Sequence, residues 1–152
     1  MMPFDRLVRA MDGWAAANPQ VPVEIQIGKG AYEPAHARWV RKVPLADYRA
    51  RVEGCALFVA HCGMGSIISA IEAGKPILML PRLQAMGEHN SDHQLATARH
   101  IGVRPGLHVA ADEADLLARA SALLTNSGTA PAPIARFADS GFTAAIRNFI
   151  EG

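Results

Sequence analysis

A short apolar run followed at once by a glycine-containing turn constrains the fold of this chain more than any other feature. Residues 56–60 (ALFVA) have the unbroken apolar pattern of a parallel strand buried on both faces. Gly63 and Gly65 follow, and residues 66–73 predict a helix that stops at a glycine. A second apolar strand is predicted at residues 77–80. The sequence therefore predicts a strand, a turn, a helix and a strand in immediate succession.

The turn is suited to binding an anion. Gly63 and Gly65 carry no Cβ, so a ligand can approach the backbone there. Ser66 falls at the cap or in the first turn of the helix, where unpaired N–H groups and the helix dipole favour an anion such as a diphosphate. His61 is a candidate hydrogen-bond donor at the rim. The alternatives are a tight turn without a ligand for the glycines and a simple capping role for Ser66.

A second group of polar residues follows the second apolar strand. His89 and His93 are four residues apart, so on one helix both imidazoles would share a face, and a metal pair is an alternative function for them. That pair would need His61 or Asp92 as a third ligand. The group as a whole comprises Arg82, Glu88, His89, Asp92, His93 and Gln94.

Together the two clusters resemble a known family. The chain is similar to the C-terminal, donor-binding half of GT-B glycosyltransferases of family 28. The similarity lies in a series of motifs and elements in this order: H-C-G-x-G-S, a helix, G-K-P, an apolar strand, P-R and E-H-x-x-D-H-Q. The similarity extends from residues 3–7 (PFDRL) to about Gly102. It is strongest to the small catalytic subunit of two-subunit bacterial exopolysaccharide glycosyltransferases, relatives of the soluble subunit of the dolichol-linked GlcNAc transferase. The resemblance implies an α/β fold, a Rossmann-like parallel sheet with helices on both faces.

The resemblance also implies residue roles. His61 would be the catalytic residue. Ser69 and Glu72 are the candidates for contact with the ribose. Many relatives carry a ribose-binding glutamate where this chain has Ser69, and Glu72 lies one turn later. No cofactor and no metal are expected, since the resembling enzymes bind their donor without a metal. The donor diphosphate would contact Gly63, Met64, Gly65 and Ser66, and the sugar Arg82, Glu88, His89, Asp92, His93 and Gln94.

The implied activity is that of a hexosyltransferase in polysaccharide biosynthesis, which transfers a hexose or a uronic acid from a UDP-sugar to a lipid-linked acceptor. In the resembling enzymes a membrane-associated partner subunit supplies the acceptor site, so the chain alone is expected to bind donor weakly and turn over little. With 152 residues it has about half the size expected of a two-domain transferase. The alternative is a noncatalytic nucleotide-sugar-binding or assembly subunit.

The composition of the chain restricts its function class and its expected location. The net charge of +1 gives no support for nucleic-acid binding, and the arginines are scattered among acidic residues. No apolar stretch approaches a membrane span and no signal peptide is recognisable, so a cytoplasmic protein is expected, with recruitment to the inner membrane face by a partner. Cys55 and Cys62 are expected to be reduced. A dinucleotide-dependent oxidoreductase is disfavoured because G-x-G-x-x-G spacing is absent. A homo-oligomer stays open.

The remaining chain predicts an alternation of helices and strands, with one strand absent. Relatives begin with an apolar strand and a Gly-Thr loop before the P-F-D-R-L helix, whereas this sequence starts at Met1. In a sheet of order 3-2-1-4-5-6 that strand is central, so we expect a truncated start and another strand or a second chain in the gap. The domain expectations are a nucleotide-sugar-binding domain at 1–125, a linker at 126–133 and a C-terminal helix at 134–152. Further predicted elements are a helix that begins at Pro3 and is ended by Asn18-Pro19, strands at 21–27 and 38–43, and helices at 44–54 and 112–124. Residues 88–100 are predicted to form a helix, or a loop followed by a helix.

Overall fold

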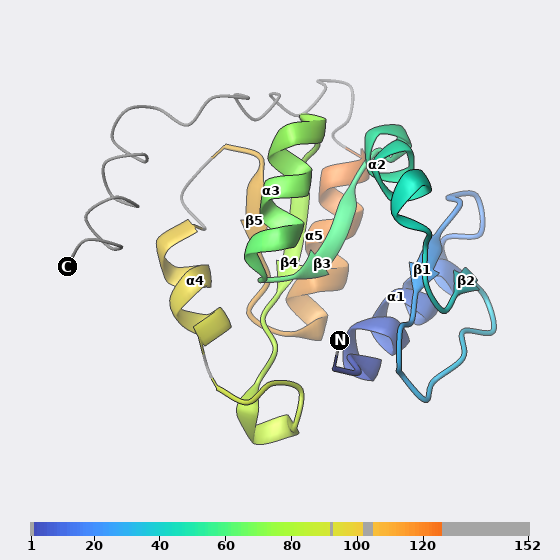
Figure 1. Cartoon of the computed structure of the whole chain (residues 1–152). Helices are drawn as coiled ribbons and strands as arrows, with labels where there is room; N and C mark the ends of the chain where they lie inside the picture. Colours follow the sequence, from blue (N-terminus) through green and yellow to red (C-terminus); the bar gives the residue numbers. More distant parts are fainter. Residues whose placement is uncertain (1, 92, 102–104, 126–152) are drawn as a thin grey trace.

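Five parallel strands form two separate sheets in the computed structural model, which describes residues 2–91, 93–101 and 105–125 (Figure 1). In the first sheet β1 (Glu24–Gln26) pairs with β2 (Arg38–Val40). In the second, β4 (Ile77–Leu80) lies between β3 (Phe58–His61) and β5 (Leu107–Val109). Among the described residues, β1 and β3 have no strand between them and do not pair with each other.

Helices cover both faces of the three-stranded sheet. Because side chains alternate along a strand, Leu78 and Leu80 face one side, and Ile77 and Met79 face the other. The first pair belongs to a core cluster with α1 and α5, and the second to a cluster with α3 and α4. All four side chains are at most 1% exposed, so β4 is the centre of the core. The helices are α1 (Asp5–Ala17), α2 (Leu45–Gly54), α3 (Met64–Ala73), α4 (His93–Ile101) and α5 (Glu113–Thr125), with a 3₁₀ turn η1 at Gln84–Met86.

Local sequence explains the two helices next to the site. α1 buries Val8, Met11 and Trp14 at helical spacing, and the Trp14 indole donates a hydrogen bond of 2.8 Å to Ser121 Oγ on α5. α3 ends at Gly74, whose φ of 63° is in the left-handed region that favours glycine. These interactions hold α1 against one face of the sheet and give α3 a defined length.

A buried carboxylate shapes the loop between β1 and β2. Asp12 on α1 is 1% exposed and accepts hydrogen bonds of 2.6 to 3.0 Å from the Tyr32 hydroxyl and from the N–H groups of Ala35, His36 and Ala37. Burial opposes its ionisation, but these donors outweigh burial and hold the pKa of Asp12 well below its usual value. The loop is thereby fastened to α1.

The α/β class and the parallel sheet are confirmed, and several boundaries were wrong. α3 begins at Met64 and not at Ser66, because the extended backbone of Gly63 is already the cap. The first two strands have three residues each, shorter than the predicted 21–27 and 38–43. β5 was missed, since three residues carry little periodic signal. The predicted linker and C-terminal helix lie outside the described residues.

Candidate functional site

Some of the polar residues singled out from the sequence lie at the carboxyl ends of β3 and β4. His61 is the last residue of β3, and Arg82 follows β4 by two residues. α3 starts at Met64, so its amino end lies at the same edge of the sheet. Ligands of open parallel α/β sheets bind at this edge.

Two backbone N–H groups are unpaired at the start of α3. The Gly63 N–H donates to His61 O at 2.8 Å, and the N–H groups of Ser66 and Ile67 donate to Gly63 O at 3.0 and 3.2 Å. No hydrogen bond within the described part of the chain uses the N–H groups of Met64 and Gly65. The helix therefore offers two donors, together with its dipole, to an anion.

The two glycines of the turn serve different purposes. A Cβ on Gly63 would overlap the His61 ring and lie 2.6 Å from its Nδ1, so Gly63 lets the imidazole pack over the turn. A Cβ on Gly65 would meet no atom within 4 Å. The space in front of Gly65 is open, as a ligand that approaches the backbone would require.

His61 is half-buried, and its Nδ1 is buried without a hydrogen-bond partner in the described structure. Burial lowers the pKa of His61 to about 4, and the positive charge of Arg82 contributes in the same direction. The imidazole is therefore neutral at pH 7. In that state the ring has one N–H donor and one acceptor nitrogen, of which the buried Nδ1 is not accessible to a ligand.

Arg82 is buried with little compensation for its charge. Its side chain is stacked on the Phe4 ring, with Cζ 5.0 Å from the ring centroid, and Nη2 donates to Met2 O at 2.9 Å. Its Nε is buried and unpartnered, and no ion pair of Arg82 is found within the described residues. Burial lowers the pKa of Arg82, an effect that Glu88 opposes. A positive charge at this edge is left without a bonded carboxylate.

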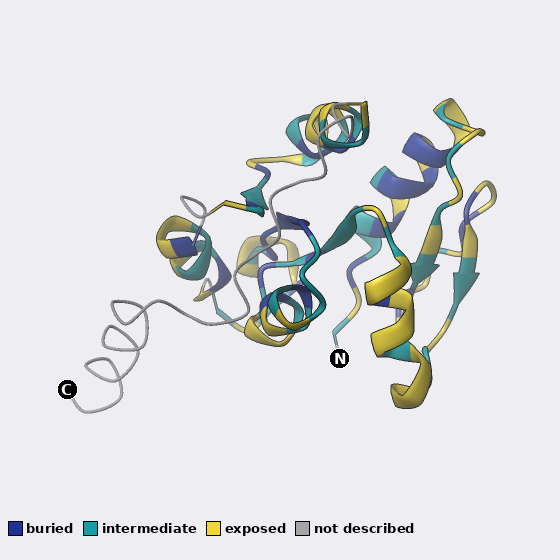
Figure 2. Cartoon of the chain, turned by 90° about the horizontal axis from the view of Figure 1, so that it is seen from above, coloured by how far each residue is buried: buried dark blue, intermediate teal, exposed yellow. Residues whose placement is uncertain are grey.

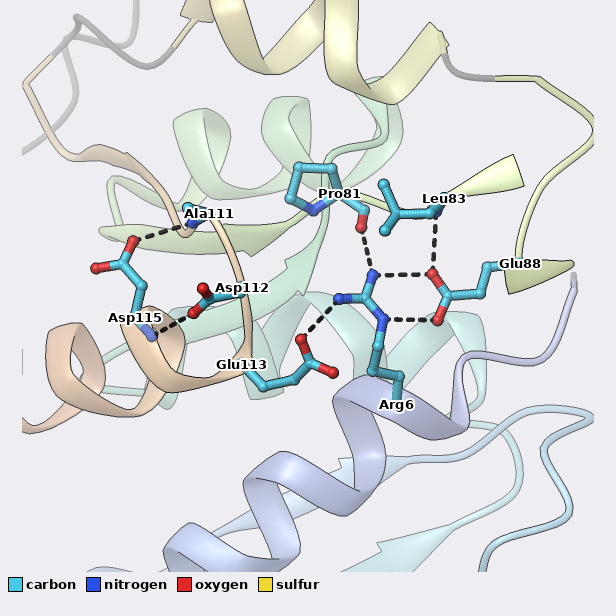
Figure 3. Close-up of polar contacts among 8 residues, drawn as sticks. All are labelled: Arg6, Pro81, Leu83, Glu88, Ala111, Asp112, Glu113 and Asp115. Atoms are coloured by element: carbon cyan, nitrogen blue, oxygen red, sulfur yellow. Dashed lines mark hydrogen bonds and ion pairs between the residues drawn. The ribbon is translucent and has the colours of Figure 1, made fainter. Parts of the chain in front are cut away.

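Glu88 is bonded to a different arginine, Arg6 on α1 (Figure 3). Arg6 donates to both Glu88 carboxylate oxygens at 2.8 and 2.9 Å, to Pro81 O at 2.8 Å and to Glu113 at 3.0 Å. The Leu83 N–H donates to Glu88 Oε2 at 3.0 Å. Glu88 thus holds the loop after β4, and protein donors occupy both of its oxygens. Sequence reasoning missed Arg6, which only formed part of the P-F-D-R-L run.

The remaining sugar candidates are placed differently from one another. Gln94 is buried on α4 and accepts a hydrogen bond of 3.1 Å from the Arg82 N–H. His89 lies before α4, with Nδ1 3.1 Å from Ser91 O, and His93 is the exposed first residue of the helix. The two imidazoles therefore do not lie on one helix, the arrangement on which the alternative metal pair depended. Asp92 lies outside the described residues, among which no group of three His, Cys, Asp or Glu could hold a metal ion.

The two ribose candidates lie along α3, away from the sheet edge. Ser69 Oγ donates to Gly65 O at 2.8 Å, and Glu72 is exposed one turn later. Both line a shallow groove of ≈ 250 Å³ between α2 and α3, together with Leu45 and Tyr48. No described helix is long and apolar enough to cross a membrane.

One solved structure shares this fold, and two others show weaker similarity. The glycosyltransferase of kitacinnamycin is similar with a TM-score of 0.56 and 20% identity, over 82% of this chain and 32% of that chain. SnogD from Streptomyces nogalater has a TM-score of 0.42 and 21% identity, over 93% and 39% of the two chains. The glycosyltransferase VinC, in a complex with dTDP, has a TM-score of 0.42 and 18% identity, over 94% and 38%. This chain thus spans between 32% and 39% of the length of these proteins.

No curated protein matched the chain. The profile of the glycosyltransferase family 28 C-terminal domain, in contrast, matches residues 3–147, which is nearly the whole sequence. The match includes α1, the turn at Gly63, the Arg82 loop and α4. This chain therefore belongs to the glycosyltransferase family 28 C-terminal domain family.

Proposed function

We propose that the chain is the donor-binding catalytic subunit of a glycosyltransferase that transfers a hexose or a uronic acid from a UDP-sugar to a lipid-linked acceptor in polysaccharide biosynthesis. Membership of the family supports the transferase class. The observation that carries the donor site is the combination of two unpaired N–H groups at Met64 and Gly65, open space before Gly65, and the Arg82 charge. All three favour an anionic ligand at one edge of the sheet.

The proposed chemistry follows from charge development. Departure of a nucleoside diphosphate leaves negative charge on its oxygens, and donors that bind these oxygens more strongly in the transition state lower the barrier. The Met64 and Gly65 N–H groups, the Ser66 hydroxyl and Arg82 would take this role. His61, neutral at pH 7, would donate a hydrogen bond from the rim. Attack by an acceptor hydroxyl at the anomeric carbon breaks the bond to the diphosphate, and the hydroxyl proton passes to a base.

The other residues divide into ligand contacts and supports. We assign ribose contact to Ser69 and Glu72, because both line the groove between α2 and α3. Glu88 is assigned a positioning role, since Arg6 and Leu83 already use both of its oxygens. The sugar contacts are assigned to Arg82, His89, Asp92, His93 and Gln94.

A partner is part of the proposal. A His61 pKa of about 4 makes its imidazole a weak base at neutral pH, which supports a base supplied from elsewhere. We assign the base to a membrane-associated partner subunit at the cytoplasmic face, which would also supply the acceptor site, as the resemblance implies. The same observation favours a second candidate, a noncatalytic nucleotide-sugar-binding subunit. Transfer of labelled sugar by the chain together with its partner would separate the two candidates. If the chain only binds the nucleotide sugar, substitutions in its donor site should leave the rate of transfer unchanged.

Calorimetric titration with UDP, UDP-glucose, UDP-glucuronate and UDP-GlcNAc tests donor binding and ranks the sugars. Gly65→Val should abolish binding without unfolding the chain, because its side chain would enter open space. Gly13→Val is the matched control, since Gly13 is an exposed glycine of α1 with equally open surroundings. Binding that survives in Gly65→Val, or that disappears equally in Gly13→Val, would contradict the donor site.

A further inference from the structure

Two arginines with little solvent exposure lie against one aromatic ring beside the candidate site. The Cζ atoms of Arg6 and Arg82 are 5.4 and 5.0 Å from the centroid of the Phe4 ring. Arg6 belongs to α1 and Arg82 to the loop after β4, so the tertiary structure brings together two cations from distant parts of the sequence. Their like charges repel each other, and burial away from water adds to the cost. An anionic partner would stabilise either guanidinium.

The carboxylates of this cluster are divided unequally between the two arginines. Within the described residues, Glu88 and Glu113 are the carboxylates bonded here, and both are bonded to Arg6 (Figure 3). Arg82 is 6% exposed, and Glu88 is close enough to favour its charged form, which raises its pKa against the effect of burial. Nevertheless Nη2 of Arg82 donates to the uncharged Met2 O. Among the described residues, one arginine thus has two anionic partners and the other has none.

The hydrogen bonds of Arg6 explain this unequal division. Arg6 donates to both oxygens of Glu88 at 2.8 and 2.9 Å, so this carboxylate is directed toward α1. Arg6 also donates to Pro81 O at 2.8 Å, and the Leu83 N–H donates to Glu88 Oε2 at 3.0 Å. The residues before and after Arg82 are therefore held by the same cluster that takes Glu88 away from it.

The free charge of Arg82 lies where a ligand is expected. Contact with the Phe4 ring offsets only part of the cost of a buried cation. Arg82 follows the carboxyl end of β4, at the edge of the sheet where the unpaired N–H groups of α3 also lie. An anionic oxygen at this edge would form a charge-assisted hydrogen bond with the guanidinium. The charge of Arg82 is available for this bond because Arg6 binds the two carboxylates.

We propose that Arg6 is a positioning residue of the donor site. By binding Glu88 and Glu113, it keeps the Arg82 guanidinium free for an anionic oxygen of the donor. This oxygen belongs to the diphosphate or to the carboxylate of a uronic acid, which offer the same chemistry to a guanidinium. All three side-chain nitrogens of Arg6 donate to protein acceptors, so Arg6 acts through Arg82. The inference rests on the proposed function, because it concerns the same ligand.

Calorimetric titration with UDP-glucuronate tests the proposal. In Arg6→Gln the Glu88 carboxylate is released and should pair with Arg82, whereas Glu113, whose side chain is 42% exposed, can be solvated. Affinity should therefore fall at least about tenfold, as expected for the loss of a hydrogen bond to a charged group. Adding Glu88→Gln removes the competing carboxylate and should restore most of the affinity. Affinity that does not fall in Arg6→Gln, or that is not restored in the double variant, would overturn the proposal.

Arg9→Gln is the matched control, because it removes the same charge from the same helix. Figure 2 shows that α1 has both buried and exposed residues, and Arg9 is one of the exposed ones. Its guanidinium lies over the Tyr32 ring, with Cζ 4.2 Å from the centroid, and not in the Arg6 cluster. Donor affinity of Arg9→Gln should equal that of the unsubstituted chain. An equal loss in Arg9→Gln and Arg6→Gln would show a general effect of charge and overturn the proposal.

Comparison with UDP and UDP-glucose locates the anionic oxygen. An equal loss of affinity for all three ligands in Arg6→Gln would assign Arg82 to the diphosphate, which all three contain. A loss confined to UDP-glucuronate would assign Arg82 to the sugar carboxylate.

The Nε–H signal of Arg82 in ¹H–¹⁵N NMR spectra tests the division of the carboxylates without a ligand. Pairing with Glu88 should shift this signal in Arg6→Gln, and Glu88→Gln should reverse the shift, which a general loosening of the loop would not produce. An unchanged signal would overturn the proposal. The expected shift and reversal, in a folded chain that binds no UDP compound, would instead remove the donor function and leave the division of the carboxylates in place.

Discussion

At the scale of single residues, Gly63 and Gly65 in the turn between β3 and α3 are required for different structural reasons. Gly63 makes room for the His61 ring inside the protein, and Gly65 leaves space outside it. His61 itself is held neutral by burial beside Arg82. Replacing one of these residues should therefore change the pKa of His61 or the free energy of unfolding.

Gly63→Ala should displace the His61 imidazole, because the new Cβ would overlap its ring. Overpacking of this kind costs about 1–3 kcal/mol of unfolding free energy. A displaced ring becomes better hydrated, so the pKa of His61 should rise toward the unperturbed 6.5. NMR titration of the imidazole measures this, with Gly65→Ala as the control. The free energy of unfolding of Gly65→Ala should rise by about 0.5–1 kcal/mol, because alanine has the higher helix propensity. An unchanged His61 pKa in Gly63→Ala would contradict the packing argument.

The pH dependence of stability should carry a His61 contribution. Its pKa is about 4 in the folded chain and 6.5 when unperturbed, so protonation favours unfolding. The contribution of neutral His61 is complete above pH 6.5 and is lost as the pH falls from 6.5 through 4. His61→Gln should therefore lose less stability than the unsubstituted chain between pH 7 and pH 5 in urea denaturation. His93→Gln, at an exposed position, should behave like the unsubstituted chain.

At the scale of elements, the Arg6 side chain connects α1, the loop after β4 and the start of α5 (Figure 3). The exposed fractions of its side chain and of Glu88 are 12% and 9%. The hydrogen bond with Glu88 is the main reason why the pKa of Arg6 is raised. Two helices and the loop that carries Arg82 are therefore positioned by one guanidinium.

Arg6→Met should destabilise the chain by about 3 kcal/mol, because it leaves the Glu88 carboxylate buried without its partner. Adding Glu88→Met should recover much of this loss, since the uncompensated charge is then removed. Urea denaturation of the four chains in a double-mutant cycle measures the coupling. The exposed pair Arg49–Glu53 provides the control, for which little coupling is expected. Additive effects of the Arg6 and Glu88 substitutions would contradict the arrangement.

At the scale of the whole molecule, stability is distributed unevenly between the two sheets. β4 is buried along its full length and paired on both sides, whereas β1 and β2 are short and exposed or partly buried. The smaller sheet is connected to the larger one through the α1 core and not through strand pairing. The two sheets can therefore open with different free energies.

Native-state hydrogen exchange should resolve this difference. The slowest amides are expected within β4, at Leu78, Met79 and Leu80, because their exposure requires global unfolding. The Ile25 and Val40 amides should exchange faster, through opening of the smaller sheet. Exchange at Ile25 as slow as at Leu78 would show that the two sheets unfold as one unit.

Elements with a strong local signal were predictable. The four-residue apolar run of β4 has the predicted bounds, and α3 ends at Gly74 as expected, since the left-handed conformation there favours glycine. The convergence of His61, Arg82 and Gln94 also followed from their positions after parallel strands, because those strands end at one edge. A weak signal failed at β5, a strand of three residues whose pairing depends on packing against distant residues.

The sequence by itself determined the α/β class, the strand–turn–helix unit around Gly63 and Gly65 and the family resemblance, because each depends on neighbouring residues. Only the tertiary structure decided that Glu88 pairs with Arg6, 82 residues away, and that Arg82 has no such partner. It also decided that β1 and β3 present open edges to each other. Such contacts join segments far apart in the chain, and their energies depend on burial and direction, which local sequence does not specify.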